Sequence, residues 1–490
     1  MPSSHPPVRG APQVHSSPGA HSPVPAVESS DGLRILGTGE LVSHLENLRD
    51  GPLAFGEVVR RGEVAIPALE RILRGPADLV YQPRTLAADA LAAIATPLAV
   101  GALIRALLDS TRRDLSPQLL EAESVLVNHL AEHLSRFPRP EVTDALLAAL
   151  QRRRYPYCAA AAGLTGDARA IPLLIECLYD DTARPAGVAA LRRFGAAALK
   201  PLIAALLQPL VSGTLEAPSR VDGRVACAKL LGHLAASGAG EARVAKRALT
   251  RALSDAQRAV RVRAAVELVR CGAPEGFDAV GILAMALDEE NWIRAEEIIA
   301  ALLRIGPAAE PMIVAMIDVR PRHESDRRRR LRAVEAAGRL PAPSAVGRLR
   351  AFQHAPESNL RLAAVTALGR MPGVDTGSIT PFLNDREPTV RFRALQTLRQ
   401  RDSLDPAMAV QLLTDGNDEI RKLALESVHE NLHGAVPALR HAAWHGGAPV
   451  HGLVPRLRLW WYACALMAGA GEVPTVKQAH PRLRGHRSRI

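Results

Sequence analysis

The stretch DREPTVRFRALQTL, residues 385–398, has a counterpart thirty residues later, DGNDEIRKLALESV, residues 415–428. In both copies an aspartate lies six residues before an arginine, and a β-branched residue directly precedes that arginine. The same offset occurs in five pairs: Asp255 and Arg261, Asp288 and Arg294, Asp326 and Arg332, Asp385 and Arg391, and Asp415 and Arg421. The chain therefore contains an internal repeat.

The spacing of the copies indicates the size of the repeated unit. A further copy at residues 359–371 keeps Leu360-Arg361 but has Ala355 in place of the aspartate. With Arg361 included, the arginines are separated by steps of 33, 38, 29, 30 and 30 residues. Periods of this length are typical of a repeat built from one supersecondary unit.

Each copy has the pattern of a helix with one buried face. An aspartate before a helical run suits an N-terminal cap, because its carboxylate accepts free backbone N–H groups. The pattern V-R-x-x-A-x-x-x-[LV] then begins at Val260, Leu360, Val390 and Ile420, with Leu or Ile in place of Val in two copies. Positions four apart share a helix face, and the alanine lets a neighbouring backbone approach. We expect this stripe to pack against the next unit.

A second apolar run accompanies each copy, such as VGILAMAL from Val280 and EPMIVAMI from Glu310. Two helices per unit, with Gly, Pro or Asp between them and no strand-like alternation, predict an antiparallel helix hairpin. One hairpin cannot bury both of its faces. Stacked hairpins can, so the sequence predicts an all-α solenoid.

These residues resemble the HEAT repeats, and in particular the bacterial phycobilisome-lyase-like HEAT repeats, over about residues 155–445. A further match is AAGLTGDARAIPLLIECL, residues 161–178, with a Gly-Asp turn before the next helix. The resemblance implies a right-handed, armadillo-type superhelix of about eleven hairpins. It also implies a ladder of hydrogen bonds along the stack, in which the repeat aspartates and arginines take part.

The ends of the chain differ from the repeats in composition. Residues 1–32 are rich in Pro, Ser and His and are expected to form a disordered tail, followed by the solenoid at 33–448. Residues 449–476 hold a Trp-rich segment that we interpret as a capping helix, with a partner-docking surface as the alternative. Residues 477–490 are expected to form a basic disordered tail.

Composition narrows the function classes. The net charge of +11 owes much to the basic C-terminal tail, and only five of the 61 basic residues are lysine, as in a GC-rich bacterial genome. The five cysteines include no C-x-x-C pair, so buried free thiols in a reducing cytoplasm are expected. The sequence shows neither a secretory signal nor an apolar run near 20 residues, which argues against a membrane span.

The repeats favour a non-catalytic scaffold or adaptor that binds protein partners on its concave surface, with no cofactor and no catalytic residue. HEAT geometry implies that polar positions on the second helix of each hairpin form that surface. The candidate contacts are Arg263, Glu267, Arg393, Gln396, Lys422 and Glu426.

Two alternatives stay open. The segment RPRHESDRRRRLR, residues 320–332, is expected to be a basic loop, and Arg327, Arg328, Arg329 and Arg330 within it could contact nucleic-acid phosphates. Stacking aromatics are absent there, so nucleic acid is not the favoured partner.

The second alternative is a zinc hydrolase. His429-Glu430-x-x-His433 matches the H-E-x-x-H pattern, which would place two zinc ligands on one helix face with a glutamate as general base. The third ligand of the longer pattern is missing. The competing interpretation is a helix end, where histidines complement the negative end of the dipole.

Overall fold

The computed structural model describes residues 30–47, 51–79, 82–208, 216–237, 240–272 and 279–445. Within these ranges the chain is helical and contains no β-strand. It divides into two compact units, Met1–Leu230 (unit 1) and Leu231–Ile490 (unit 2), each described by itself below. The predicted all-α fold is confirmed.

The helices of unit 1 follow one another with short connections. They are α1 (Ser30–Ile35), α2 (Thr38–Ser43), α3 (Gly51–Arg61), α4 (Ile66–Leu73), α5 (Gln82–Ile94), α6 (Pro97–Arg112), α7 (Pro117–Leu134), α8 (Pro140–Arg152), α9 (Pro156–Thr165), α10 (Ala170–Cys177), α11 (Arg184–Phe194) and α12 (Leu199–Leu206). The next helix, α13 (Pro218–Ala236), contains the boundary between the units.

Unit 2 continues the same alternation, with short 3₁₀ helices at several connections. Its α-helices are α14 (Ala242–Ala252), α15 (Arg258–Arg270), α16 (Val280–Met285), α17 (Trp292–Ile305), α18 (Glu310–Asp318), α19 (Glu324–Arg339), α20 (Val346–Ala351), α21 (Ser358–Arg370), α22 (Pro388–Gln400), α23 (Pro406–Leu412), α24 (Asp418–Glu430) and α25 (Leu432–His445). A 3₁₀ helix, η10 (Thr380–Asn384), takes the place of the first α-helix in the hairpin that ends with α22.

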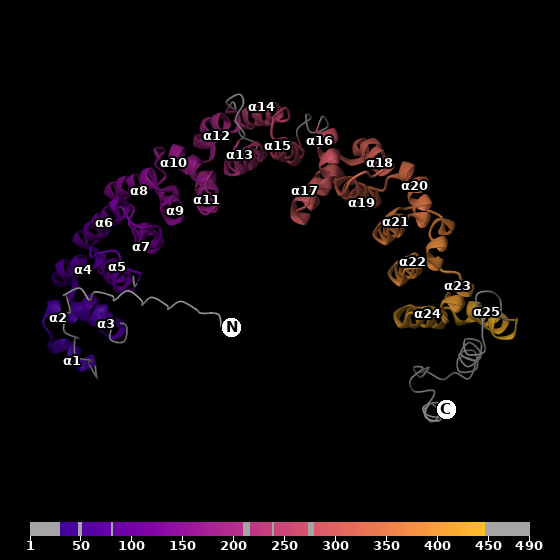
Figure 1. The fold of residues 1–490 in the computed structure, drawn as a ribbon, viewed down its shortest axis with the longest axis horizontal. Helices are drawn as coiled ribbons and strands as arrows, with labels where there is room; N and C mark the ends of the chain where they lie inside the picture. The colour runs from indigo at the N-terminus through magenta and orange to yellow at the C-terminus, as the bar shows by residue number, and fades with distance from the viewer. Residues whose placement is uncertain are drawn as a thin grey trace, which may run out of the picture. The chain divides into compact units, whose positions relative to one another are not determined.

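Consecutive helices pair as hairpins, and the hairpins stack within each unit (Figure 1). Eleven such pairs, one of them η10 with α22, are in contact in the described ranges, and Arg224 of α13 also donates to the Leu206 carbonyl of α12; the number is close to the predicted eleven or so. In unit 2 the second helices of the hairpins, α15, α17, α19, α21, α22 and α24, contact one another in that order. We call the outward surface of this layer the second-helix face of unit 2; it lies on the inner side of that unit's curve (Figure 1).

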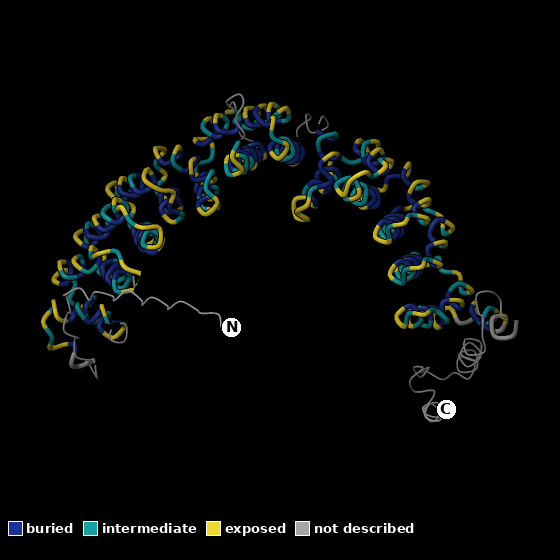
Figure 2. The backbone as a smooth tube through the Cα atoms, in the orientation of Figure 1, coloured by how far each residue is buried: buried dark blue, intermediate teal, exposed yellow. Residues whose placement is uncertain are grey.

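The repeat pattern predicts the buried face correctly. Its first apolar positions, including Val390 and Ile420, are inaccessible to solvent, and the four alanines Ala264, Ala364, Ala394 and Ala424 are fully buried. Figure 2 shows the buried residues between the two helix layers and the exposed residues on the outer sides of each. The apolar stripe therefore joins neighbouring hairpins, as expected.

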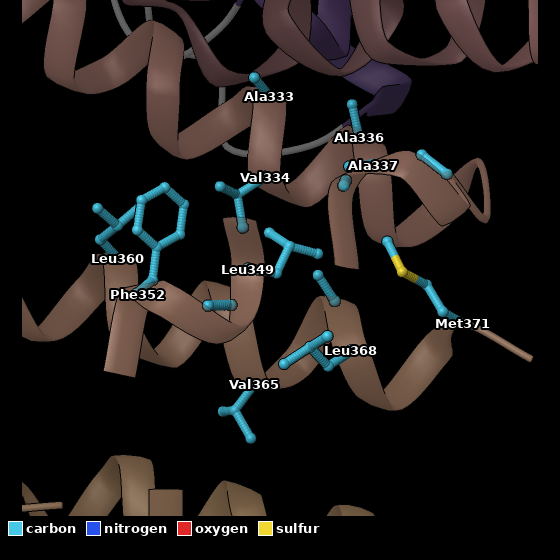
Figure 3. Packing of buried hydrophobic residues seen from close by; sticks show 14 of the residues in the cluster. Ala333, Val334, Ala336, Ala337, Leu349, Phe352, Leu360, Val365, Leu368 and Met371 are labelled. Atoms are coloured by element: carbon cyan, nitrogen blue, oxygen red, sulfur yellow. The ribbon is translucent and has the colours of Figure 1, made fainter. Parts of the chain in front are cut away.

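The core of unit 2 is built mainly of Ala, Leu, Val and Ile. Figure 3 shows one section of it, where Ala333 and Ala337 of α19 lie above Leu349 of α20 and Leu368 of α21. Small side chains on one helix lie opposite larger side chains on the next helix, and this arrangement permits close packing without cavities. Aromatic residues are only 3% of the chain, so aliphatic packing carries most of the stability.

Glycines allow the closest contacts between second helices. A Cβ placed on Gly338 of α19 would lie 2.5 Å from the Cα of Ala367 on α21, and one on Gly163 of α9 would lie 2.4 Å from the Cβ of Ala190 on α11. Both distances are far shorter than van der Waals contact. These glycines are needed because a neighbouring helix occupies the space, and the same device serves both units.

One described stretch, Trp292–Asp318, has the length and mean hydropathy, 1.6, of a membrane span. It consists of two helices, α17 and α18, which a 3₁₀ turn separates at Gly306, whose φ is 77°. Both helices contribute residues to the core of unit 2. Solenoid packing accounts for their apolar character.

Three predicted segments lie outside the described residues: the tails at residues 1–32 and 477–490 and the capping helix at 449–476. The exception is residues 30–32, which form the start of α1. These assignments stay predictions. The predicted solenoid at 33–448 is described up to His445.

Candidate partner-binding face

The repeat aspartates do not cap their helices directly. Asp385 lies two residues before Glu387, the N-cap of α22, and its Oδ1 accepts the Glu387 N–H at 2.9 Å. Asp415 has the same relation to Asn417, the N-cap of α24, at 2.8 Å. Each aspartate therefore stabilises the turn that precedes the helix, because its side chain accepts the N–H of the residue two positions later, which is the N-cap. The expected N-cap role is wrong for these residues.

The arginines of the repeat join successive hairpins. Arg391 donates from Nη1 to the backbone carbonyl of Asp385 at 2.7 Å, while Nε and Nη2 donate to the Asp415 carboxylate at 2.7 and 2.8 Å. Arg361 binds the Asp385 carboxylate in the same way at 2.7 and 2.9 Å. Each guanidinium thus binds its own repeat through a carbonyl and the next repeat through a carboxylate, which is the ladder that the HEAT resemblance implies.

Electrostatics of the ladder follow from this geometry. Burial raises the pKa of Asp385, but the hydrogen bonds from Arg361 and from the Glu387 N–H outweigh burial and hold it below its ordinary value. The pKa of Asp415 is lowered for the same reasons, with Arg391 and Asn417 as donors. Both carboxylates are therefore ionised at neutral pH.

The ladder does not extend to every predicted pair. Arg261 donates to the Asp255 carbonyl at 2.6 Å, but the Asp288 carboxylate of the next repeat is bound by Arg258 and, at 2.9 Å, by Arg329. Arg294 is exposed, and its side chain has no hydrogen-bond partner within the described ranges. The six-residue offset therefore predicted the wrong arginine as the partner of Asp288.

The Arg-rich segment is helix α19 from Glu324 onward and not a loop. Asp326 lies at its third position, where the carboxylate accepts the N–H groups of Arg322 and His323. Arg332 donates instead to the backbone carbonyls of Leu287 and Glu289, in the connection between α16 and α17. The Asp326–Arg332 pair is therefore out of register with the other copies.

The four arginines predicted as a basic patch are largely engaged within the protein. Arg328 pairs with Glu290 at 2.9 Å, and Arg329 pairs with Asp288 at 2.9 Å and Asp326 at 3.0 Å. Arg330 donates to the Ile317 carbonyl and stacks over the ring of Phe352 at 4.6 Å, and burial lowers its pKa. Arg327 has weaker contacts with acidic residues, the nearer being Glu324 at 3.4 Å. Little unpaired positive charge is left for phosphates.

Two of the predicted contact residues are not available on the second-helix face. Glu267 is 1% exposed, and burial raises the pKa of its carboxyl group. Arg263 lies between Glu267 and Glu297, with 2.6 Å to the Glu297 carboxylate. The sequence pattern missed this because the preceding second helix, α13, packs against Glu267 at Gly232 and covers the side chain.

The other predicted contacts reach solvent more fully. Arg393 is exposed and donates to Gln396 at 2.8 Å, and Lys422 is exposed. Glu426 is exposed but pairs with Arg399 at 2.9 Å. Their role in partner binding stays a prediction.

The second-helix face of unit 2 contains a groove of about 350 Å³ that the sequence did not predict. Its apolar wall includes Leu331 of α19 and Leu362 and Ala363 of α21, and Arg370 and Arg393 lie at its rim. Glu335 of α19 also lines the groove and interacts electrostatically with Arg370, whereas Arg393 has no acidic partner within the described ranges. The groove therefore combines an apolar surface with one arginine, Arg393, whose charge no nearby acid among the described residues offsets.

A third rim arginine is neutralised. Arg339 also lines the groove, and its guanidinium pairs with Glu296 of α17 at 2.5 Å. The positive charge without an acidic partner in the described part of the chain thus belongs to Arg393 of α22. The spacing of the second helices, and not any motif, brings these residues together.

The H-E-x-x-H motif is placed at the end of α24. His429 is exposed, and Glu430 accepts hydrogen bonds from Arg399, with 3.1 Å from Nε. The side chain of His433 lies outside the described part of the structure. The glutamate that a zinc hydrolase would need as general base is therefore held in an ion pair.

The described cysteines are free thiols, and Cys158, Cys177 and Cys227 are buried. Burial raises the pKa of Cys177 and of Cys227 to about 12. These thiols stay protonated at neutral pH and are poor nucleophiles.

No protein-family model matches the sequence, and no curated protein matches it. Among solved structures, the fold is similar to Kap95p in its structure with RanGDP, with a TM-score of 0.53 and 11% identity, over 92% of this chain and 69% of that one. The karyopherin Kap121p, solved with the extreme C-terminus of the protein phosphatase Cdc14p, has a TM-score of 0.41 and 14% identity. That match covers 87% of this chain and 55% of the Kap121p chain. The likeness to Kap95p shows the fold alone, a solenoid of the HEAT-repeat type.

Proposed function

We propose that this protein is a non-catalytic scaffold or adaptor that binds a protein partner through the second-helix face of unit 2. The observation that carries the proposal is the groove between α19, α21 and α22. Arg393 lies at its rim without an acidic partner in the described part of the chain, and Arg370 lies at the rim within electrostatic reach of Glu335, whereas the arginines of α19 are largely paired with neighbouring acids or carbonyls. Unpaired charge beside an apolar wall is a feature of recognition surfaces.

The groove suggests the chemistry of the partner. Leu331, Leu362 and Ala363 offer room for an aliphatic or aromatic side chain. Arg370 and Arg393 would then bind carboxylates on either side of it, as bidentate forks. We infer that the partner presents a short acidic segment with one apolar anchor.

Three related expectations form part of the proposal. The repeats are of the bacterial phycobilisome-lyase-like class, as their sequence pattern suggests. The protein acts in the cytoplasm, where its buried free thiols stay reduced. It performs no chemistry itself, in keeping with Kap95p-like solenoid architecture and the pairing of Glu430 with Arg399.

Peptide display on the full chain tests the proposal. Acidic peptides with an apolar anchor should be enriched, and Arg370→Glu with Arg393→Glu should weaken their binding about tenfold or more, since each charge contact contributes about 0.5–1 kcal/mol and reversal adds repulsion. Arg350→Glu, on α20 in the other helix layer, is the matched control and should leave binding unchanged.

A photo-crosslinking amino acid at Thr366, in the groove, provides an independent measurement. Crosslinks to the enriched peptide are expected at Thr366 and not at Arg350. Equal crosslinking at both positions, or enrichment of basic peptides, would count against the proposed face.

The nucleic-acid alternative has less support. Arg328, Arg329 and Arg330 are held by internal acids, carbonyls and the Phe352 ring. We therefore expect no DNA or RNA binding through α19 at physiological salt.

A further inference from the structure

Three potential metal ligands converge on the second-helix side of unit 1. Asp89 lies on α5, and His129 and His133 lie on α7. Both Nε2 atoms are 2.7 Å from the same Asp89 oxygen, Oδ1, and the two Nε2 atoms are 3.2 Å apart. No other group of three such ligands occurs within the described ranges.

The helix geometry fixes this convergence. His129 and His133 are four residues apart, so they lie on one face of α7, with ring centroids 4.6 Å apart and an interplanar angle of 85°. Helix α5 packs against α7 as the preceding second helix, and this contact brings Asp89 to both rings. The ligands therefore come from two neighbouring hairpins.

The cluster is partly accessible to solvent. The side chains of Asp89 and His129 are 34% and 29% exposed, whereas that of His133 is 9% exposed. The site thus offers one carboxylate oxygen and two imidazole nitrogens, and two of its three side chains are partly open to solvent.

The alternative is a hydrogen-bonded group with no ligand. In that state two imidazole N–H groups share one carboxylate oxygen, and the buried Nδ1 of His133 has no hydrogen-bond partner within the described residues. A divalent cation placed between the three atoms would bind all of them at once. Two imidazoles and a carboxylate are ligands of zinc and other divalent transition metals.

We propose that Asp89, His129 and His133 form a binding site for a divalent transition-metal ion, with zinc as the reference ligand. Three protein ligands leave at least one coordination position for water or for a group on a partner. The ion would join α5 to α7 and so link two consecutive hairpins. The lack of a hydrogen-bond partner at His133 Nδ1 predicts modest affinity, because outer-sphere partners typically contribute about 10–100-fold.

Zinc titration of the metal-free full-length protein, followed with a competing chromogenic chelator, tests the site. We expect one equivalent to bind to the wild type. His129→Ala and Asp89→Asn should each weaken binding at least about tenfold. Asp89→Asn is nearly isosteric, so it keeps the test valid if the histidine variant unfolds. Far-UV circular dichroism checks the fold of each.

His429→Ala is the control, because it removes the first histidine of the H-E-x-x-H motif in unit 2. It should bind zinc as the wild type does. Loss of binding in His429→Ala with retention in Asp89→Asn would overturn the proposal, as would the same affinity in all variants. No binding by the wild type up to millimolar zinc would also overturn it.

Cobalt provides a second measurement. Co²⁺ bound to nitrogen and oxygen ligands absorbs in the visible range, and we expect this absorption in the wild type and in His429→Ala but not in Asp89→Asn. Zinc should raise the Tm of the wild type, since a ligand bound only to the folded state stabilises it, and should not raise that of Asp89→Asn.

Discussion

In unit 2 Arg361 of α21 binds the carboxylate of Asp385, whereas in unit 1 Arg84 of α5 binds the carboxylate of Glu123. The two arginines have equivalent places near the start of a second helix. Each also donates to a carbonyl at the end of the preceding helix region, Ala355 for Arg361 and Leu73 for Arg84. Both pairs are buried, with side-chain exposures of 3% and 4% in unit 2 and 6% and 2% in unit 1.

The two pairs differ in where the acid lies along the chain. Asp385 is 24 residues after Arg361 and lies in the turn before α22, while Glu123 is 39 residues after Arg84 and lies inside α7. In both units the stack requires a carboxylate beside the buried arginine of a second helix. The carboxylate can come from a turn, as with Asp385, or from within a helix, as with Glu123. Only the turn aspartates recur at a regular offset in the sequence.

The largest effect is expected from Glu123→Ala. The substitution leaves Arg84 buried without its counter-ion and also removes the carboxylate 3.6 Å from Arg113. Breaking a buried pair by removing one partner costs about 3–5 kcal/mol. Hydrogen exchange measured by mass spectrometry should show faster exchange in α5 and α7, since a solenoid loses stability locally.

Glu121→Ala is the control on the same helix, because Glu121 is exposed. It should leave exchange in α5 unchanged. Equal effects of the two substitutions would show that the buried pair in unit 1 does not hold the hairpins together.

A somewhat smaller loss is expected from Asp385→Ala, about 3 kcal/mol, at the lower end of the range for buried pairs. Each arginine would keep two other acceptors, but Glu123→Ala also takes a carboxylate from a second arginine, Arg113, whereas Asp385→Ala takes one from Arg361 alone. Urea unfolding and hydrogen exchange in α21 and α22 check this. A loss greater than that of Glu123→Ala would reverse the order proposed for the two units.

Gly338→Ala tests the close helix contact that both units share. The new Cβ would meet the Ala367 backbone, so we expect a loss of about 1–3 kcal/mol from overpacking. Gly347→Ala is the matched control, since no atom lies within 4 Å of its added Cβ and it also lies in a helix. It should be neutral or should stabilise by about 0.5–1 kcal/mol. Urea midpoints distinguish the two.

The smallest effect is expected from Asp415→Asn, about 1 kcal/mol at neutral pH, because the amide can still accept a bond from Arg391. The pKa of Asp415 is lower in the folded state than its ordinary value, so its carboxylate stabilises the fold above that ordinary pKa. This stabilisation is lost as pH falls through the folded pKa. The difference between wild type and Asp415→Asn should therefore shrink below about pH 4.

Urea unfolding at a series of pH values measures this difference. A gap that stays constant from neutral to strongly acidic pH would mean that the Asp415 charge does not contribute. The same series on Asp385→Asn should show the same direction, because the pKa of Asp385 is lowered too.

The sequence predicted most of the fold but only part of the candidate site. The stripe from Val390 to Leu398 is buried as expected, because helical periodicity depends on nearest neighbours along one helix. The role of Glu267 was wrong because its burial depends on the approach of another helix near Gly232. The groove beside Arg370 and Arg393 was missed for the same reason.

The ligands of the proposed metal site show what signal was present. The segment NHLAEHL, residues 128–134, places two histidines on one helix face. The third ligand, Asp89, is 40 residues before His129 and belongs to another hairpin. A search for histidines at helical spacing could have found the pair, but not its carboxylate.

The amino-acid sequence by itself determined the helices, their pairing in hairpins and the apolar stripe between hairpins, because these follow from local periodicity and from the need to bury one face of each unit. The contacts between helices set which arginine meets which carboxylate, how Arg370 and Arg393 come to line one groove, and how Asp89 reaches His129 and His133. Those contacts depend on the distance and register between neighbouring helices, which close packing sets and which no single repeat encodes.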